Sequence, residues 1–199
     1  MEEGYIKFKA LWEKSPPLPH RFLKELIIWR DSLYAKHLIG AYENGIGFGN
    51  ISQRFGKSDN FIISGSGTGN FETLKADHFS MVTSMDIDRN QLTCSGPVIA
   101  SSESMSHGVM YTTAKNVHGV IHVHHKGLWM KLLDKVPTTS KNAMYGTPEM
   151  AHEIIRLFTE TDLADKKIVV MKGHEEGIFT FGESLDEAGN ILLNYYNSL

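Results

Sequence analysis

The chain has 199 residues, of which 41% are hydrophobic and 22% charged, and its formal net charge is −3. This length and balance are those of one ordinary globular domain that buries a sizeable core without disulfides. No run of Lys and Arg stands out, which argues against nucleic acid as a partner because binding the phosphate backbone needs a concentrated basic face.

Cys94 is the only cysteine, so an intrachain disulfide and a cysteine-rich zinc module are both excluded. The charged N-terminus lacks the apolar core of a signal peptide. No stretch approaches the ~20 apolar residues of a membrane span. We therefore expect a cytoplasmic protein with no membrane partner. It is read as one domain over residues 1–199, with residues 1–19 as an N-terminal extension.

The first half of the chain predicts one helix and two hairpins. A helical spacing of apolar residues begins after Pro19 and predicts a helix over residues 22–42, with Asn44 and Gly45 as its stop. Alternating apolar runs bounded by turn residues predict the hairpins. Their strands lie within residues 45–55 and 61–70, and within 79–88 and 91–96.

The second half alternates helices and strands. Helices are expected over 103–116, 126–135, 147–161 and 184–197, and strands over 119–125, 166–173 and 178–182. Ser101 and Ser102 are candidate caps of the first helix, and Ser184 with Glu187 forms a capping box at the last. Because the first strands come as hairpins, we expect an α/β (α+β type) fold, a mainly antiparallel central sheet flanked by helices.

The strand over 119–125 carries two histidines at alternate positions, His122 and His124. Side chains at i and i+2 of a strand share a face, so these imidazoles lie side by side. With a third ligand they could bind a divalent metal, and His174 follows a later apolar run. The pair could equally form a polar core or a surface strand. The other histidines, His107 and His125 among them, are assigned to packing or surface roles.

Glu103 is a candidate base, because a carboxylate beside a metal can ligate it and then take a proton from substrate. In the first turn of a helix the same residue could simply interact with the helix dipole. Glycine and serine gather near Asn50, Ser66 and Ser101, where backbone N–H groups and hydroxyls can bind a phosphate. Such residues also make ordinary turns, so each loop alone leaves both readings open.

Six segments occur in the order found in a known family. They are GNIS at 49–52, FIISGSGTGNFETL at 61–74, SSE at 101–103, HVH at 122–124, YGTPEMA at 145–151 and GHEEGIFTFGESLDEA at 173–188. By these motifs the chain resembles the class II aldolase/adducin family from about residue 20 to its end. The resemblance implies a central, mainly antiparallel sheet flanked by helices and commonly a homotetramer.

The resemblance also implies roles for individual residues. Zinc would be bound by His122, His124 and His174, or another divalent metal such as manganese, cobalt or iron would take its place. Glu103 would be the catalytic acid/base. The residues that would bind the substrate phosphate are Gly49, Asn50, Ser66, Gly67, Ser101 and Ser102. Phe48 is bulkier than the residue usual before the Gly-Asn pair, and residues 1–19 could supply a group that closes the site.

The implied function is a metal-dependent lyase of carbohydrate metabolism. It would cleave a small sugar or ketose 1-phosphate by a retro-aldol reaction through a metal-stabilised enediolate. Three alternatives stay open: a sugar-phosphate dehydratase, a decarboxylase or epimerase of the same family, and a non-catalytic adducin-like binding module. The epimerase branch carries an aspartate in place of Glu103, which speaks against that alternative.

Overall fold

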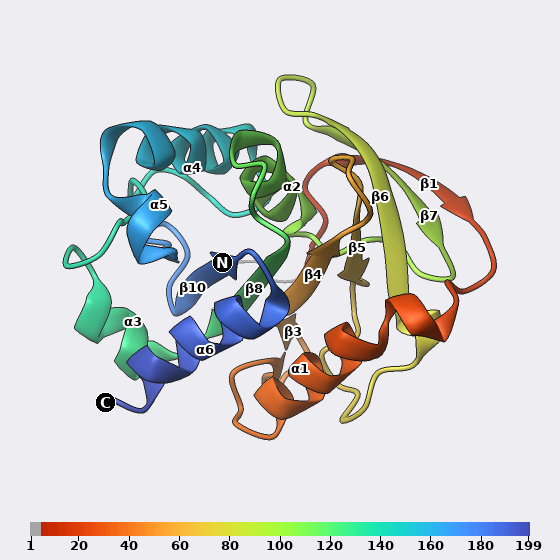
Figure 1. Cartoon of the computed structure of the whole chain (residues 1–199), viewed down its shortest axis with the longest axis horizontal. Coiled ribbons are helices and arrows are strands. Elements are labelled where there is room, and N and C mark those ends of the chain that lie inside the picture. The colour runs from red at the N-terminus through yellow and green to blue at the C-terminus, as the bar shows by residue number, and fades with distance from the viewer. Residues whose placement is uncertain (1–4) are drawn as a thin grey trace.

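A computed structural model of the chain describes residues 5–199. Within this range eight strands form one sheet in the order β1-β7-β6-β5-β4-β8-β10-β9 (Figure 1). Neighbouring strands run antiparallel except β1 and β7, which are parallel. The expected mainly antiparallel sheet is therefore confirmed. Its strands are β1 Lys9–Lys14, β4 Asn50–Arg54, β5 Phe61–Ser64, β6 Phe79–Asp86, β7 Gln91–Gly96, β8 Gly119–His124, β9 Ile168–Val170 and β10 Gly177–Gly182.

Helices cover both faces of this sheet, as the upper and lower groups in Figure 1 show. One face carries α1 Lys24–Tyr34, α3 Lys126–Leu132 and α6 Leu185–Tyr196, and the other carries α2 Ser104–Thr113, α4 Pro148–Glu160 and α5 Leu163–Lys166. Each group closes its own apolar core against the sheet. Two 3₁₀ turns, η1 His20–Phe22 and η2 Ala76–His78, and a two-stranded ribbon, β2 Gly40–Ala41 with β3 Gly47–Phe48, complete the described elements.

Strand β8 lies between β4 and β10, so both of its edges are hydrogen-bonded. Its side chains alternate between the two cores, as the period of a strand requires. Ile121 and Val123 pack in the core under α1 and α6, whereas Val120 packs in the core under α2 and α4. His122 and His124 share the face of Val120. The alternation thus aims both imidazoles toward the side of the sheet that α2 covers.

The predicted helix over 22–42 is too long, because α1 ends at Tyr34. His37 adopts a left-handed conformation with φ of 57°, and the N–H of Leu38 donates to the carbonyl of Leu33 at 3.0 Å. That reversal is a Schellman-type ending, which usually takes a glycine. The apolar residues after it belong to a loop and to β2, so their helical spacing is coincidental.

The predicted cap of α2 is also wrong. Glu103 occupies the N-cap position, and neither Ser101 nor Ser102 caps the helix. At α6 the expected Ser184 cap is confirmed, since its hydroxyl accepts the N–H of Glu187 at 3.0 Å. The Glu187 carboxylate accepts the N–H of Glu183 instead of closing the expected box.

Both predicted hairpins form, β4 with β5 and β6 with β7. Strand β1, within the expected N-terminal extension, had no signal in the sequence, because most of its side chains are exposed and charged residues interrupt any alternation. Residues 1–4 of that extension lie outside the described residues. The single domain over 1–199 stays a prediction. No helix within 5–199 has the length and apolar character to cross a bilayer.

Candidate metal and catalytic site

Three buried imidazoles meet at the end of β8. His122 and His124 come from that strand, and His174 comes from the turn between β9 and β10. One ring nitrogen from each histidine lies within 4.8 Å of the others. The hydrogen-bonded register between β8 and β10 brings the turn beside the strand, with Gly177 opposite His124. The structure therefore brings together the three histidines that the sequence singled out.

The Nδ1 atoms of the two β8 histidines are both hydrogen-bonded to other groups. Nδ1 of His122 donates to the carbonyl of Ile178 at 3.1 Å, since a carbonyl can only accept. The hydroxyl of Tyr42 donates to Glu176 at 3.0 Å and lies 2.9 Å from Nδ1 of His124. With its one proton given to Glu176, this hydroxyl accepts the Nδ1 proton of His124. Both Nε2 atoms then carry lone pairs.

These two Nε2 atoms lie only 3.2 Å apart. Two lone pairs repel one another, so a cation between or beside the rings would stabilise this arrangement. Bonds of ~2.0–2.1 Å at a tetrahedral zinc place neighbouring nitrogens about 3.3 Å apart, close to that spacing. Burial, the largest cause, lowers the pKa of His124 well below its usual value. Neutral imidazoles are the form that binds metal, so these residues fit a divalent ion.

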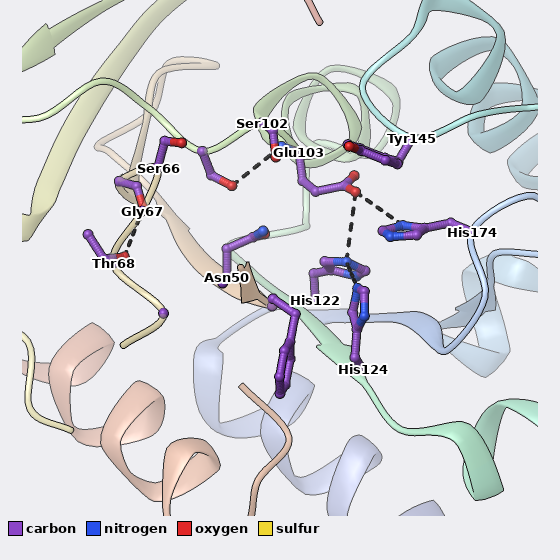
Figure 2. A pocket seen from close by; sticks show the side chains of 16 residues that line it. Asn50, Ser66, Gly67, Thr68, Ser102, Glu103, His122, His124, Tyr145 and His174 are labelled. Carbon is purple, nitrogen blue, oxygen red and sulfur yellow. Dashed lines mark hydrogen bonds and ion pairs between the residues drawn. The ribbon is translucent and has the colours of Figure 1, made fainter. Parts of the chain in front are cut away.

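Glu103 is almost fully buried at the start of α2, and its carboxylate is directed at the histidines (Figure 2). Oε1 lies 3.3 Å from Nδ1 of His174 and 3.8 Å from Nε2 of His122, while Oε2 accepts the hydroxyl of Ser106 at 3.2 Å. Burial by itself raises the pKa of Glu103, but the interaction with His174 outweighs it and holds the pKa below its usual value. The group is therefore a carboxylate at neutral pH.

A pocket opens over this cluster, with glycine- and serine-rich loops on its other side (Figure 2). The left-handed φ of Gly49, 73°, turns the chain between β3 and β4 into the pocket. Ser101 also orders the wall, because its hydroxyl accepts the N–H of Glu103 at 3.4 Å. All ten residues expected at the site line this pocket: Gly49, Asn50, Ser66, Gly67, Ser101, Ser102, Glu103, His122, His124 and His174.

Comparison with known proteins identifies the family of this chain. A family model described as the class II aldolase and adducin N-terminal domain matches residues 34–197. The chain belongs to this family. No curated protein sequence matches it.

Solved structures of the family share the fold at low identity. An L-fuculose 1-phosphate aldolase is 22% identical with a TM-score of 0.69, the match covering 91% of this chain and 84% of that one. A sugar-phosphate aldolase from Thermotoga maritima is 14% identical with a TM-score of 0.67, covering 88% and 90%. An L-fuculose 1-phosphate aldolase from Glaciozyma antarctica PI12 is 15% identical with a TM-score of 0.56, covering 87% and 70%. This likeness establishes the class II aldolase fold for our chain.

Several contacts around the pocket were not expected from the sequence. Tyr42 fell at the end of the predicted helix over 22–42, yet its hydroxyl lies 2.9 Å from Nδ1 of His124. Phe48 stacks on the His124 ring, with centroids 5.5 Å apart and planes 26° apart. His107 was assigned to a packing or surface role, yet its Nε2 atom is hydrogen-bonded to Asn50. Only the spacing of His107 four residues after Glu103, one helical turn, could have signalled its place.

Proposed function

We propose that this protein is a metal-dependent lyase that cleaves a small sugar or ketose 1-phosphate by a retro-aldol reaction. The observation that carries the proposal is the Glu103 carboxylate, 3.3 Å from His174 and 3.8 Å from His122 in one buried pocket. The metal would be zinc, or manganese, cobalt or iron, held by His122, His124 and His174. When bound it would supply Lewis-acid polarisation of a carbonyl oxygen.

Glu103 is the group that moves the proton. Its carboxylate is ionised, faces the pocket and keeps one oxygen, Oε2, oriented by Ser106. It accepts a proton from the substrate and returns one to the carbon next to the carbonyl after the carbon–carbon bond has broken. The buried surroundings exclude water from this exchange and so protect the carbanionic fragment from side reactions.

The opposite wall of the pocket offers donors for a phosphate group. Gly49, Ser66 and Gly67 line the same space as Asn50, Ser101 and Ser102. Loops of this kind bind phosphate through several N–H groups at once. A ketone phosphate would then bind with its phosphate at this wall and its carbonyl at the histidines. We expect a homo-oligomer, with the tetramer implied by the family resemblance.

The test is product analysis with metal-loaded protein and a panel of ketose 1-phosphates. We expect dihydroxyacetone phosphate and an aldehyde to be released by the wild type. Glu103→Gln should reduce turnover by about 10²–10⁴-fold, the usual contribution of an acid/base group, while metal content stays unchanged. Turnover by Glu103→Gln equal to that of the wild type would contradict the assigned role.

The same experiment separates the alternatives. A dehydratase would release water and leave the carbon chain whole, and a decarboxylase would release carbon dioxide. An epimerase would change one stereocentre without a change in mass. If no panel member reacts and no metal binds, the adducin-like binding module becomes the better reading. The burial of four functional groups in one pocket speaks against that reading, because a non-catalytic module has no need to desolvate them.

A further inference from the structure

A chain of four polar side chains runs beneath the pocket, from α2 to β4. The hydroxyls of Tyr111 and Ser52 lie 2.7 Å apart, and Ser52 Oγ lies 2.6 Å from Nδ1 of His107. Nε2 of His107 then lies 2.5 Å from Oδ1 of Asn50. All four residues are at least nine-tenths buried. Only the last member, Asn50, lines the pocket.

The local structure explains why these groups meet. Asn50 and Ser52 are two residues apart on β4 and therefore share a face of the sheet. His107 and Tyr111 are four residues apart on α2 and share a face of that helix. The same helical face carries Glu103, one turn before His107. One side of α2 thus supplies both the carboxylate of the site and the groups that reach Asn50.

Two directions of hydrogen bonding are compatible with these distances. Burial lowers the pKa of His107 to about 3, so the ring is neutral and carries one N–H. In the first direction the Tyr111 hydroxyl donates to Ser52, Ser52 donates to Nδ1, and Nε2–H donates to the Asn50 carbonyl oxygen. In the second every bond reverses, and the Asn50 amide nitrogen donates to His107.

The phenol of Tyr111 decides between them. In the first direction its proton is used by Ser52. In the second Nδ1–H of His107 donates to Ser52, so either the Ser52 proton or the phenol proton needs another acceptor; among residues 5–199 the hydrogen bonds of these two hydroxyls are limited to each other and to His107. A buried donor without an acceptor costs about 1–3 kcal/mol. An oxygen with an unused lone pair is tolerated more readily. The first direction is therefore favoured.

We propose that Tyr111, Ser52 and His107 are positioning residues that hold Asn50 with its two amide N–H groups directed into the pocket. There they bind an anionic oxygen of a phosphorylated substrate. The ligand in this proposal rests on the proposed function, whereas the orientation of the amide does not. Figure 2 shows Asn50 between the Ser66–Gly67 loop and the histidines, the place from which its N–H groups reach such an oxygen.

Arg54 anchors the outer end of this chain of hydrogen bonds. Its guanidinium lies over the Tyr111 ring, 5.1 Å from the centroid, and one N–H donates to the backbone carbonyl of Tyr111 at 2.6 Å. The same group pairs with Asp59 at 2.8 Å. These contacts fix the position of the Tyr111 phenol, as is required of a residue that positions others.

The first test reads the tautomer of His107 by long-range ¹H–¹⁵N NMR of wild-type protein labelled on histidine. The signal is assigned by its absence in His107→Gln. We expect the Nε2–H tautomer. The Nδ1–H tautomer would overturn the proposal, because the Asn50 carbonyl oxygen would then face the pocket.

The second test measures binding of dihydroxyacetone phosphate to zinc-loaded protein by calorimetry, in a matched pair of variants. His107→Gln keeps a donor for Asn50 and an acceptor for Ser52, whereas His107→Leu keeps only the packing. Since hydrogen bonds to charged groups contribute about 1.5–3 kcal/mol, we expect His107→Leu to bind about tenfold or more weakly. His107→Gln should remain within about threefold of the wild type on the same scale.

Equal affinity of His107→Leu and the wild type would overturn the positioning role. Zinc content is measured in each protein, since His107 is not among the metal-binding residues and should not affect it. If the wild type fails to bind dihydroxyacetone phosphate, the proposed function fails. The tautomer of His107 then decides the orientation of Asn50 by itself, so the two failures are distinguishable.

Discussion

The ring of Tyr145 stacks on the imidazole of His174, with centroids 4.6 Å apart and planes inclined by 28°. Nζ of Lys7 lies 3.6 Å from the centroid of the Tyr145 ring. Lys7 precedes residue 34, where the family match begins. A segment outside the family match therefore contacts Tyr145, a residue that lines the candidate site.

The contact of Lys7 with Tyr145 should help to dock the N-terminal strand. A cation over an aromatic ring contributes about 0.5–2 kcal/mol, so Lys7→Met should speed amide hydrogen exchange in residues 9–14 by about 2–30-fold. Met keeps the length and apolar contacts of the side chain. Lys9→Met, a change at an exposed position of the same strand, is the control. Equal exchange in the two variants would show that the ammonium contributes nothing.

The hydroxyl of Tyr42 should tune metal affinity through His124. Tyr42→Phe keeps the ring, which packs on Phe48 with centroids 4.6 Å apart, but removes the acceptor for the Nδ1 proton. Loss of such a partner typically weakens metal binding by about 10–100-fold. Competition with a chromophoric chelator measures this change. Tyr195→Phe, on α6, is the matched control, and equal zinc affinity in both variants would refute the role of Tyr42.

Removal of metal should lower the stability of the wild type. A ligand at ~100 times its dissociation constant stabilises a protein by about 2.7 kcal/mol. For a chain of this size that corresponds to a rise in Tm of about 5–10 °C. Thermal unfolding with zinc and with a strong chelator measures the difference. The double variant His122→Ala/His124→Ala should unfold at one temperature in both conditions, and a zinc-dependent shift there would place the metal elsewhere.

The loop that carries Gly49 should not accept a side chain. Gly49 has φ of 73°, and an added Cβ would lie 2.8 Å from Cγ1 of Ile39 and 3.0 Å from the carbonyl of His122. Gly56 has φ of 68° and no heavy atom within 4 Å of that position. The loss of stability in Gly56→Ala therefore reflects only the strain of an alanine in the left-handed conformation, about 1–2 kcal/mol.

Gly49→Ala adds the steric conflict, about 1–3 kcal/mol more. Urea unfolding of the two variants isolates that difference. Because the conflict involves the backbone of a candidate metal ligand, we also expect weaker zinc binding in Gly49→Ala alone. Equal stability of the two variants would show that Ile39 moves aside.

Much of the fold could be predicted from local pattern. The two hairpins, the strand of His122 and His124, and the helix that begins at Pro148 follow from alternation, helical spacing and cap residues. The errors lie where the local sequence pattern gives no signal. Strand β1 is exposed and held by its pairing with β7, and the chain reverses after α1 at a left-handed His37, where no glycine marks the stop.

The residues of the candidate site likewise divide into those that the sequence indicated and those that it did not. The residue types and their alternation on one strand pointed to His122 and His124, because a period of two puts both rings on one face whatever the sheet around them. His174 and Glu103 lie in distant segments; their residue types made them candidates, and the six ordered motifs connected them to the pair. The partners of these residues, Tyr42 and His107, carried no such signal.

The sequence by itself determined the family, the faces of the strands and the chemical types of the site residues. The tertiary structure decided that Tyr42 and Glu176 orient His124, that Glu103 lies 3.3 Å from His174, and that Lys7 contacts Tyr145. The physical reason is that periodicity is a property of neighbouring residues. Contacts across strands and loops depend on the register and packing of segments far apart in the chain.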